Sequence, residues 1–296
     1  MQAELIADVR CQTGESPVWH QAEQALYWVD IPAGRLHRWR SVDGGLTSWQ
    51  APEQLACLAL RHGQQGWVAG LESGLFELLS SEAEAHLSTR CLVTVNHALP
   101  SMRFNDGRCD RVGRFWAGTM ALSPDPDRRP GKLYRYEAGG PLSEVLGGLK
   151  VPNGLAFSPD GQTMYLSDSH PSVQCIWAFD YDVDKGAPMN RRLFVDMNLL
   201  PGRPDGAAID VDGGYWICAN DAGLVHRFTP AGRLDRSLAV PVRKPTMCAF
   251  GGADLRTLFV TSIRPAGVEL ADQPLAGSVF ALRPGVQGMP EPVFAG

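Results

Sequence analysis

The sequence predicts an all-β fold, a six-bladed β-propeller with four-stranded antiparallel blades around a central channel. Glycine and proline are frequent, with 32 and 22 residues spread along the chain, as many short strands joined by tight turns require. Six segments share one shape, in which an apolar stretch is followed by a polar turn and an aromatic-rich strand. Helical periodicity is scarce. We therefore expect one propeller domain that spans residues 1–296.

The repeat has a regular period. When the six segments are aligned on their second strands, equivalent positions lie 40 to 50 residues apart, which is about the length of one four-stranded blade. A two-sheet sandwich has similar turn spacing but does not explain the sixfold phase. The aligned residues are Trp28, Val68, Trp116, Leu166, Trp216 and Phe259.

The expected strands follow in chain order. ELIADV near the N-terminus alternates as a strand does, and it can close the ring by joining the last blade, which removes a free sheet edge. The six two-strand segments are SPVWHQAEQALYWVD, CLALRHGQQGWVAG, RCDRVGRFWAGTM, LAFSPDGQTMYLSDS, AAIDVDGGYWICAN and CAFGGADLRTLFVTS. Third strands of blades three to six are expected at KLYRYE, QCIWAFDYD, GLVHRFT and GSVFAL.

Composition excludes several classes of function. The formal net charge of -5 argues against nucleic-acid binding, which needs clustered lysine and arginine. No run approaches the roughly 18 apolar residues of a membrane-spanning helix, and the N-terminus lacks the basic and apolar regions of an export signal. The seven cysteines never form CxxC, as expected of free thiols in a reducing compartment. We expect a cytoplasmic protein with no membrane or nucleic-acid partner.

Polar residues recur at one early position of the repeat. The first strand of each propeller blade lines the central channel, so equivalent residues on these strands converge near one point. Four of the six are carboxylates or amides, and a buried carboxylate without a partner is costly. The six residues are Glu15, Leu55, Asn105, Asn153, Asp205 and Thr246.

Such a set of oxygen donors suits a hard divalent cation. We take Glu15, Asn153 and Asp205 as ligands of one metal ion. Its identity stays open among Ca, Mg, Mn and Zn, because oxygen-only ligation admits each of them. The alternative is that the Asn-Gly and Asp-Gly pairs are simple turn residues. Simple turn residues need not lie at the same distance from the propeller axis. Four polar residues at the same position of the repeat therefore favour the metal site.

Motifs along the whole chain carry a resemblance to a known family. They are GESPVW, RFNDGRCD followed by FWAGTM, VPNGLAFSPDG, FDYD, RPDGAAID and KPTMCAFGG with LFVTS. In this order and spacing the chain resembles the regucalcin (senescence marker protein) and gluconolactonase family of sugar lactonases. The resemblance implies a six-bladed propeller with a divalent metal in the channel, held by Glu15, Asn153 and Asp205. It also implies that Arg103 and Asn105 bind a small-molecule substrate, a sugar lactone.

One position departs from the family. Some members have a glutamate three residues after the Met of AGTM, where it helps to hold sugar hydroxyls, but this chain has Ser123. A shorter neutral residue changes which hydroxyl is recognised, so the preferred sugar and its ring size stay open. The Pro- and Arg-rich loop that follows is interpreted as a surface loop, with a lid as the alternative.

The predicted constellation fits the hydrolysis of a lactone, which is a cyclic ester. A metal ion polarises the carbonyl and lowers the pKa of water, and a carboxylate beside it accepts the proton. We assign that general-base role to Asp205 and a purely ligating role to Glu15, although the sequence also allows the reverse. For Arg103 the alternative is a surface arginine paired with Asp106 or Asp110. No GxSxG elbow or phosphate-binding glycine motif is present.

The histidines form no catalytic set. None of the seven has the HExxH spacing of a zinc site. His170, in SDSH at the end of a fourth-blade strand, can face the channel mouth, but it is not assigned a catalytic role.

Two other functions compete with a metal-dependent sugar lactonase. A related hydrolase of organophosphates or hydrophobic lactones would have an apolar site mouth, whereas Arg103 and Asn105 indicate a polyol. A non-catalytic calcium-binding or protein-interaction propeller is the third hypothesis, since one fold hosts many functions. A protein-interaction scaffold does not need two carboxylates and two amides at the same position of the repeat, facing the channel. No obligatory protein partner is indicated, and the oligomeric state stays open.

Overall fold

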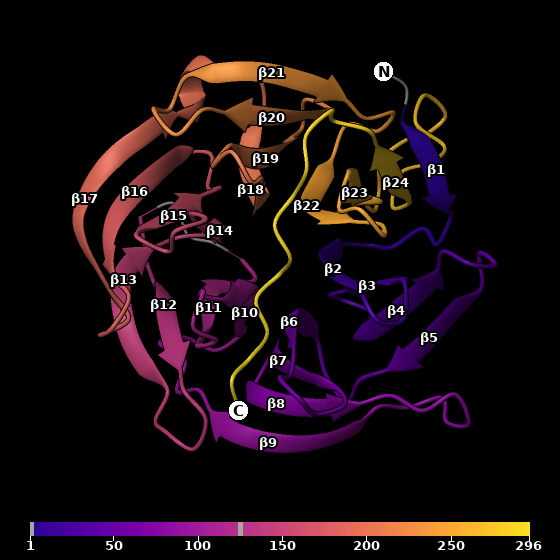
Figure 1. Cartoon of the computed structure of the whole chain (residues 1–296), viewed down its shortest axis with the longest axis horizontal. Helices are drawn as coiled ribbons and strands as arrows, with labels where there is room; N and C mark the ends of the chain where they lie inside the picture. Colours follow the sequence, from indigo (N-terminus) through magenta and orange to yellow (C-terminus); the bar gives the residue numbers. More distant parts are fainter. Residues whose placement is uncertain (1–2, 124–126) are drawn as a thin grey trace.

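The computed structural model describes residues 3–123 and 127–296. Over these residues it forms six four-stranded antiparallel sheets, arranged as blades around a central axis (Figure 1). The only helical segment in the described ranges is η1, a single 3-10 turn at Met197–Leu199. The predicted six-bladed propeller is therefore confirmed. Within the described part of the chain, no helix has the length and apolar character needed to cross a membrane.

Each of the first five blades is a meander of four consecutive strands. The first three blades consist of β2 (Gly14–His20), β3 (Ala25–Asp30), β4 (Arg35–Arg40) and β5 (Leu46–Gln50); β6 (Leu55–Leu60), β7 (Trp67–Leu71), β8 (Gly74–Leu79) and β9 (Ser88–Thr94); and β10 (Met102–Cys109), β11 (Phe115–Ala121), β12 (Gly131–Tyr136) and β13 (Ser143–Leu149). The next two consist of β14 (Pro152–Phe157), β15 (Thr163–Asp168), β16 (Cys175–Asp182) and β17 (Ala187–Asp196); and β18 (Arg203–Ile209), β19 (Tyr215–Asn220), β20 (Leu224–Phe228) and β21 (Leu234–Ala239). The sixth consists of β22 (Pro245–Gly251), β23 (Thr257–Ser262), β24 (Val279–Leu282) and β1 (Glu4–Ala7), in that order.

Segments from both ends of the sequence close the ring. β1 pairs antiparallel with β24, so an N-terminal strand becomes the outermost strand of the blade that the C-terminal part of the chain builds (Figure 1). The prediction that ELIADV joins the last blade is confirmed. This pairing covers the edge of β24, which would otherwise present unpaired backbone groups.

The core lies between neighbouring blades and depends on the second strands. The residues aligned in the repeat all lie on β3, β7, β11, β15, β19 and β23, and all are buried. Trp116 of blade three contacts Phe157 and Tyr181 of blade four, with ring centroids 6.1 and 5.9 Å away. Trp216 of blade five contacts Phe250 of blade six in the same way, at 6.0 Å. Buried aromatic rings, each covering on the order of 150–250 Å², therefore hold adjacent blades at a fixed spacing.

The innermost strands carry a repeated irregularity. They are β2, β6, β10, β14, β18 and β22, and in each of them the pairing with the second strand is interrupted by a register shift. The shift falls between Glu15 and Val18 in the first blade and between Asn153 and Ala156 in the fourth. A β-bulge bends its strand and re-aims a side chain. The bulges therefore lie at or next to the predicted site positions on all six innermost strands.

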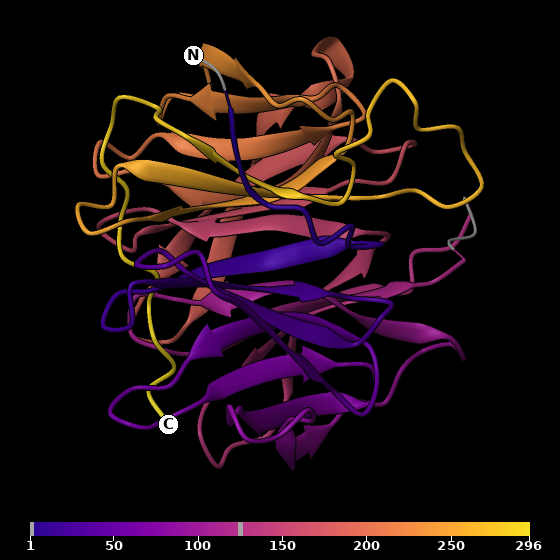
Figure 2. The same cartoon turned by 90° about the vertical axis from the view of Figure 1, so that its right-hand side faces the viewer.

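The two ends of the channel differ. Residues 283–296 cross the face toward which the innermost strands run, as the yellow segment in Figure 1 and the side view in Figure 2 show. On this segment Glu291 lies 3.5 Å from Arg108, near the end of β10, and the Phe294 ring stacks on Tyr136 with centroids 5.8 Å apart. The predicted site residues lie at the other end, where the innermost strands begin.

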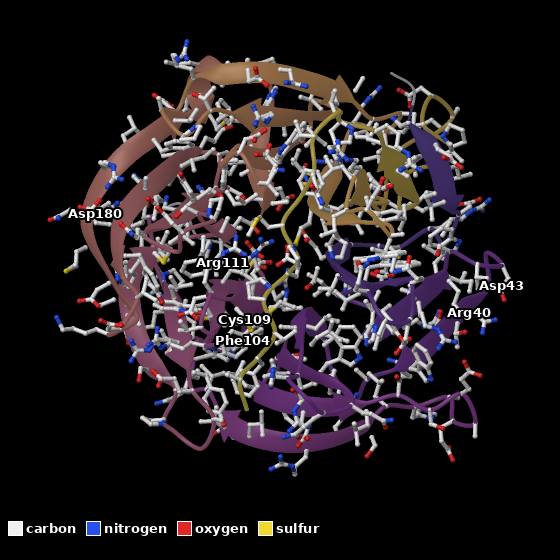
Figure 3. All side chains as sticks on the ribbon, in the orientation of Figure 1. Arg40, Asp43, Phe104, Cys109, Arg111 and Asp180 are labelled. Carbon is white, nitrogen blue, oxygen red and sulfur yellow. The ribbon has the colours of Figure 1, made fainter. Side chains whose placement is uncertain are left out.

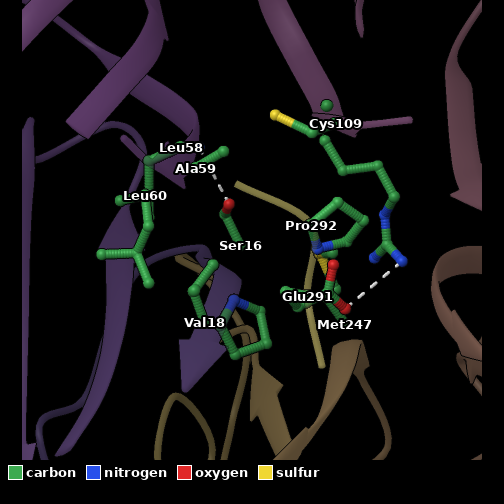
Figure 4. Close-up of a pocket in the computed structure, with 12 residues that line it drawn as sticks. Ser16, Val18, Leu58, Ala59, Leu60, Cys109, Met247, Glu291 and Pro292 are labelled. Atoms are coloured by element: carbon green, nitrogen blue, oxygen red, sulfur yellow. Dashed lines mark hydrogen bonds and ion pairs between the residues drawn. The ribbon is translucent and has the colours of Figure 1, made fainter. Parts of the chain in front are cut away.

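The end of the channel under the C-terminal segment is packed. Figure 3 shows Phe104 and Cys109 of β10 near the centre of the ring, whereas Arg40 lies at its rim. A cavity of about 10 Å³ remains between Ser16 of β2 and Glu291 of the C-terminal segment (Figure 4). It is no larger than a single water molecule needs. A small molecule would therefore meet the site residues from the opposite end.

Candidate active site

The structure brings the predicted metal ligands together. Glu15, Asn153 and Asp205 lie near the start of β2, β14 and β18, the innermost strands of blades one, four and five. All three residues are more than nine-tenths buried. The carboxylates of Glu15 and Asp205 are close enough to repel each other. Asn153 is connected to the strand of Asp205 through the side chain of Ser169.

The amide of Asn153 is held in one orientation. Its Nδ2 donates to Ser169 Oγ at 2.7 Å, and that hydroxyl in turn donates to the carbonyl oxygen of Pro204. Its Oδ1 accepts a hydrogen bond from Asn105 Nδ2 at 3.1 Å. Because an amide oxygen can accept twice, Oδ1 keeps a second lone pair for a cation.

Each carboxylate has one oxygen engaged and one available. Asp205 Oδ2 accepts from Asn220 Nδ2 at 2.7 Å, and Glu15 Oε2 accepts from the backbone N–H of Ser16 at 3.2 Å. Within residues 3–123 and 127–296, Asp205 Oδ1 and Glu15 Oε1 have no hydrogen-bond partner. Ligating carboxylates in proteins are commonly held in this way by a second group.

Burial opposes the ionisation of both carboxylates. It raises the pKa of Asp205 from its ordinary value of 3.8 to about 7. It also raises the pKa of Glu15 well above its ordinary value, and repulsion from Asp205 and Asp106 adds to this effect. A positive charge between the carboxylates would favour their ionised forms. Two carboxylates and one amide oxygen therefore fit a hard divalent cation.

The candidate ligands are two carboxylates and one amide oxygen. Among the described residues, no group of three or more His, Cys, Asp or Glu side chains is placed to hold a metal ion. A cation at this site would be held by Glu15, Asp205 and the amide oxygen of Asn153. Water or substrate would complete its coordination, as is usual for oxygen-ligated cations.

Arg103 is an interior residue, on β10 beside the ligands. One of its terminal nitrogens donates to the carbonyl oxygen of Phe104 at 2.7 Å and to Asn105 Oδ1 at 2.8 Å. Its Nε is buried and has no partner in the described part of the chain. Burial lowers the pKa of Arg103 to about 10, against the opposing effect of Glu15. Arg103 therefore does not form the surface pair with Asp106 or Asp110 that was the alternative.

Sequence reasoning missed two residues that order the site. Ser169 and Asn220 hydrogen-bond Asn153 and Asp205, and they lie at or just beyond the ends of the second strands β15 and β19. The sequence shows that second strands of the repeat end in small or polar residues, but this pattern does not indicate which of them meets a ligand. Asp106 is buried deeper in the channel, where its Oδ2 accepts from a backbone N–H at 2.8 Å and its Oδ1 has no described partner.

Ser123 lies at the same end of the molecule. It is exposed and follows β11 in the loop toward β12. The predicted choice between a surface loop and a lid falls largely on residues 124–126, which are outside the described residues.

The comparisons with known proteins agree with this geometry. A family model described as "SMP-30/Gluconolactonase/LRE-like region" matches residues 13–264. The chain therefore belongs to this family. The match to the SMP-30/gluconolactonase family covers the innermost strands of all six blades, and it confirms the resemblance inferred from the motifs.

Individual members of the SMP-30/gluconolactonase family match nearly the whole chain. A 6-deoxy-6-sulfogluconolactonase of Pseudomonas putida is 46% identical over 286 residues, which are 96% of this chain and 95% of that protein. An L-arabinolactonase of Azospirillum brasilense is 38% identical over 300 residues, which are 100% of this chain and 96% of that protein. The crystal structure of regucalcin from Agrobacterium tumefaciens, described as a calcium-binding protein, has a TM-score of 0.88 and 26% identity, and covers 99% of this chain and 97% of that chain.

Proposed function

We propose that this protein is a lactonase that hydrolyses the lactone of a sugar acid to the free aldonic acid. The observation that carries the proposal is the convergence of two buried carboxylates and one amide oxygen beside Arg103 and Asn105. Two relatives that match nearly the full length of the chain are named as sugar lactonases, which supports the reaction class. The substrate is a small-molecule sugar lactone.

The residues divide the work of opening the ester. Glu15, Asn153 and Asp205 would hold one divalent cation, and a relative described as calcium-binding supports such a cofactor. When bound, the cation supplies Lewis-acid polarisation of the ester carbonyl and favours the ionisation of water. Asp205 accepts the proton of the attacking water through Oδ1, the oxygen that Asn220 leaves available. Glu15 serves as a ligand.

The polar groups of β10 place the sugar. The guanidinium of Arg103 keeps a buried Nε–H donor that has no acceptor among the described residues, which suits a hydroxyl or ring oxygen of the lactone. Asn105 lies between Arg103 and Asn153 in the hydrogen-bond network, so it connects the sugar to the cation site. A hydrophobic lactone would leave the Nε–H donor of Arg103 unsatisfied, at a cost on the order of 1–3 kcal/mol.

Metal removal and replacement test the proposal. Protein stripped with a chelator should open no lactone, and addition of Ca, Mg, Mn or Zn singly should restore acid release from some member of a lactone panel. The panel should include gluconolactone, arabinonolactone and 6-deoxy-6-sulfogluconolactone. Full activity of stripped protein would contradict the role of the cation. Tight cation binding without turnover of any lactone would favour the non-catalytic calcium-binding propeller instead.

A further inference from the structure

A second polar cluster adjoins the site at the start of the fourth blade. Lys150 lies just before β14, and His170 and Ser172 lie in the loop after β15. Lys150 and His170 are more than nine-tenths buried. Ser169, which hydrogen-bonds Asn153, directly precedes His170, so the cluster stands beside a predicted metal ligand. The hydrolysis described above does not use it.

Hydrogen bonds order this cluster. Lys150 Nζ donates to Ser172 Oγ at 2.7 Å, and Ser172 Oγ lies 2.9 Å from His170 Nδ1. The backbone N–H of Ser172 donates to the same Nδ1 at 3.2 Å. Nδ1 is therefore an acceptor, which places the proton of the neutral ring on Nε2. Nε2 makes no hydrogen bond to any described residue, so the chain presents an oriented N–H donor without an acceptor.

Positive charge surrounds this donor. Burial lowers the pKa of His170, and the positive charges of Lys150, Arg129 and Arg203 add to the effect, against the carboxylate of Asp168. The oxygens of Asp168 are already engaged, because they accept hydrogen bonds from three backbone N–H groups at 2.8 to 3.1 Å. The ring is therefore held neutral, as a donor, among cations.

Further cations lie near the starts of β18 and β22. Arg203 Nε donates to Asp221 Oδ2 at 2.6 Å, and Lys244 Nζ pairs with the other oxygen of the same carboxylate. Two cations thus share one anion. Arg129 is exposed in the loop between β11 and β12, and it forms no ion pair with any residue of the described ranges. Cations at the mouth of a site draw in a substrate of the opposite sign.

We propose that Lys150 and His170 form a subsite for an anionic substituent of the lactone. The substrate class is then the lactone of a sugar acid that carries a second acid group, such as a sulfonate or a carboxylate, away from the reacting ester. Lys150 supplies a positive charge, and the Nε2–H of His170 supplies a hydrogen-bond donor of fixed orientation. Together they suit the binding of an oxyanion. The inference rests on the proposed lactonase function, because the subsite adjoins the position at which the ester is opened.

The test compares anionic and neutral lactones on the same protein. Wild-type protein should hydrolyse 6-deoxy-6-sulfogluconolactone with a kcat/KM at least about tenfold above that for gluconolactone, the scale of one charge-assisted hydrogen bond. The difference should lie in KM and should shrink as salt is added. A lactone with a terminal carboxylate in place of the sulfonate shows whether the subsite recognises negative charge alone or also the shape of the sulfonate group.

Variants locate the effect. Lys150→Met should lower kcat/KM for the sulfonated lactone about tenfold more than for gluconolactone. His170→Leu should act in the same direction, and His170→Gln should recover part of the loss because its amide restores an N–H donor. Lys185→Met is the matched control: it removes an exposed lysine from the β16–β17 turn, at the opposite end of the blade, and should leave the preference unchanged.

Failure of the subsite and failure of the lactonase proposal look different. A wild-type protein that opens no lactone with any divalent cation overturns both. A protein that opens neutral and anionic lactones equally well, at low and high salt, overturns the subsite alone. An unchanged preference in folded Lys150→Met does the same. Where Lys150→Met does not fold, the wild-type preference and its salt dependence decide the question.

Discussion

At the scale of single residues, neutral polar side chains order the charged ones. Asn220 engages one oxygen of Asp205, and Ser169 fixes the amide of Asn153. Neither acts as a ligand in the proposal, yet each determines which oxygen atom is left for a cation or for a proton. Charged groups buried to this degree need such partners, because a misdirected buried carboxylate is penalised by its lost hydration.

Asp205→Asn tests the general base. The change keeps the size of the side chain and a hydrogen-bond partner for Asn220, so the protein should stay folded. Turnover of the best lactone should fall by about 100-fold or more, the scale of losing a general base. Rates should be measured at saturating cation, so that weakened binding of the ion does not account for the loss. Unchanged turnover would remove Asp205 from this role.

Asn220→Ala tests the orienting role of the neighbouring amide. Removal of the 2.7 Å hydrogen bond frees Asp205 to rotate. Affinity for a divalent cation, measured by isothermal titration calorimetry, should fall by about 10- to 100-fold. Asn198→Ala, in the surface turn η1, is the control and should bind the cation as the wild type does. Equal affinities for the two variants would show that the amide does not position a ligand.

The raised pKa of Asp205 predicts how the stability of stripped protein depends on pH. Its pKa is 3.8 ordinarily and about 7 in the fold, so below about pH 4 it is protonated in both states and folding carries no penalty. As pH rises from about 4 to about 7, the unfolded chain has released this proton while the folded protein still holds it, so the free energy of unfolding falls and then levels off above pH 7. Thermal melts of chelator-treated protein should show this decline, and Asp205→Asn should flatten it. Added cation should stabilise the protein more at pH 8 than at pH 5. If the stability of the stripped protein rose with pH instead, the raised pKa of Asp205 would be contradicted.

At the scale of elements, the bulge in each innermost strand sets the site. Every bulge falls beside the same repeat position, so the polar residues at this position arrive at one end of the channel. This much can be predicted from the sequence, because the phase of the repeat and the turn residues that follow it are both visible there. Glu15, Asn105, Asn153 and Asp205 could be placed on innermost strands for that reason.

The rest of the site depends on contacts that cannot be predicted from the position of a residue within the repeat. Asn220 meets Asp205 because β18 and β19 pair Arg203 with Asn220, and the register past a bulge cannot be derived by counting residues. Lys150 and His170 belong to two loops, and their approach depends on how those loops leave the strands. Strand positions were therefore predictable, whereas the loop residues and the orienting partners were not.

Gly154→Ala tests the bulge of the fourth blade. Gly154 has a left-handed φ of +58°, and a Cβ there would lie 2.5 Å from the Tyr215 hydroxyl. The free energy of unfolding should fall by about 2–3 kcal/mol, part from the left-handed backbone and part from crowding, and cation affinity should fall because Asn153 is displaced. Gly139→Ala is the control, since Gly139 has a φ of +71° with nothing near its Cβ position. Equal losses of stability in urea titrations would exclude a role for the crowding.

At the scale of the whole molecule, the two ends of the propeller have different tasks. The C-terminal segment packs over one end through Glu291 and Phe294, so no substrate enters there. The other end collects buried polar and charged side chains from the innermost strands of blades one, three, four and five. Ligands on blades one, four and five keep their spacing only while the ring is closed. Ring closure at β1 is therefore tied to the integrity of a site that several blades share around the axis.

Removal of residues 1–7 tests this link. The deletion takes away β1, which pairs with β24 from Glu4↔Ala281 to Ala7↔Val279, and leaves the edge of β24 unpaired. We expect the free energy of unfolding to fall by about 2–4 kcal/mol, at roughly 1 kcal/mol for each lost hydrogen bond together with its apolar contacts, and we expect self-association through the exposed edge. Denaturant titration and light scattering measure the two effects. Deletion of residues 1–3, which leaves β1 intact, is the control.

Cation affinity should fall with the longer deletion alone. Glu15 follows the sixth blade directly, and it is positioned against this blade through Gly14, whose carbonyl accepts a hydrogen bond from Thr246. A stable monomer with unchanged cation affinity would show that the blades hold the site without closure of the ring.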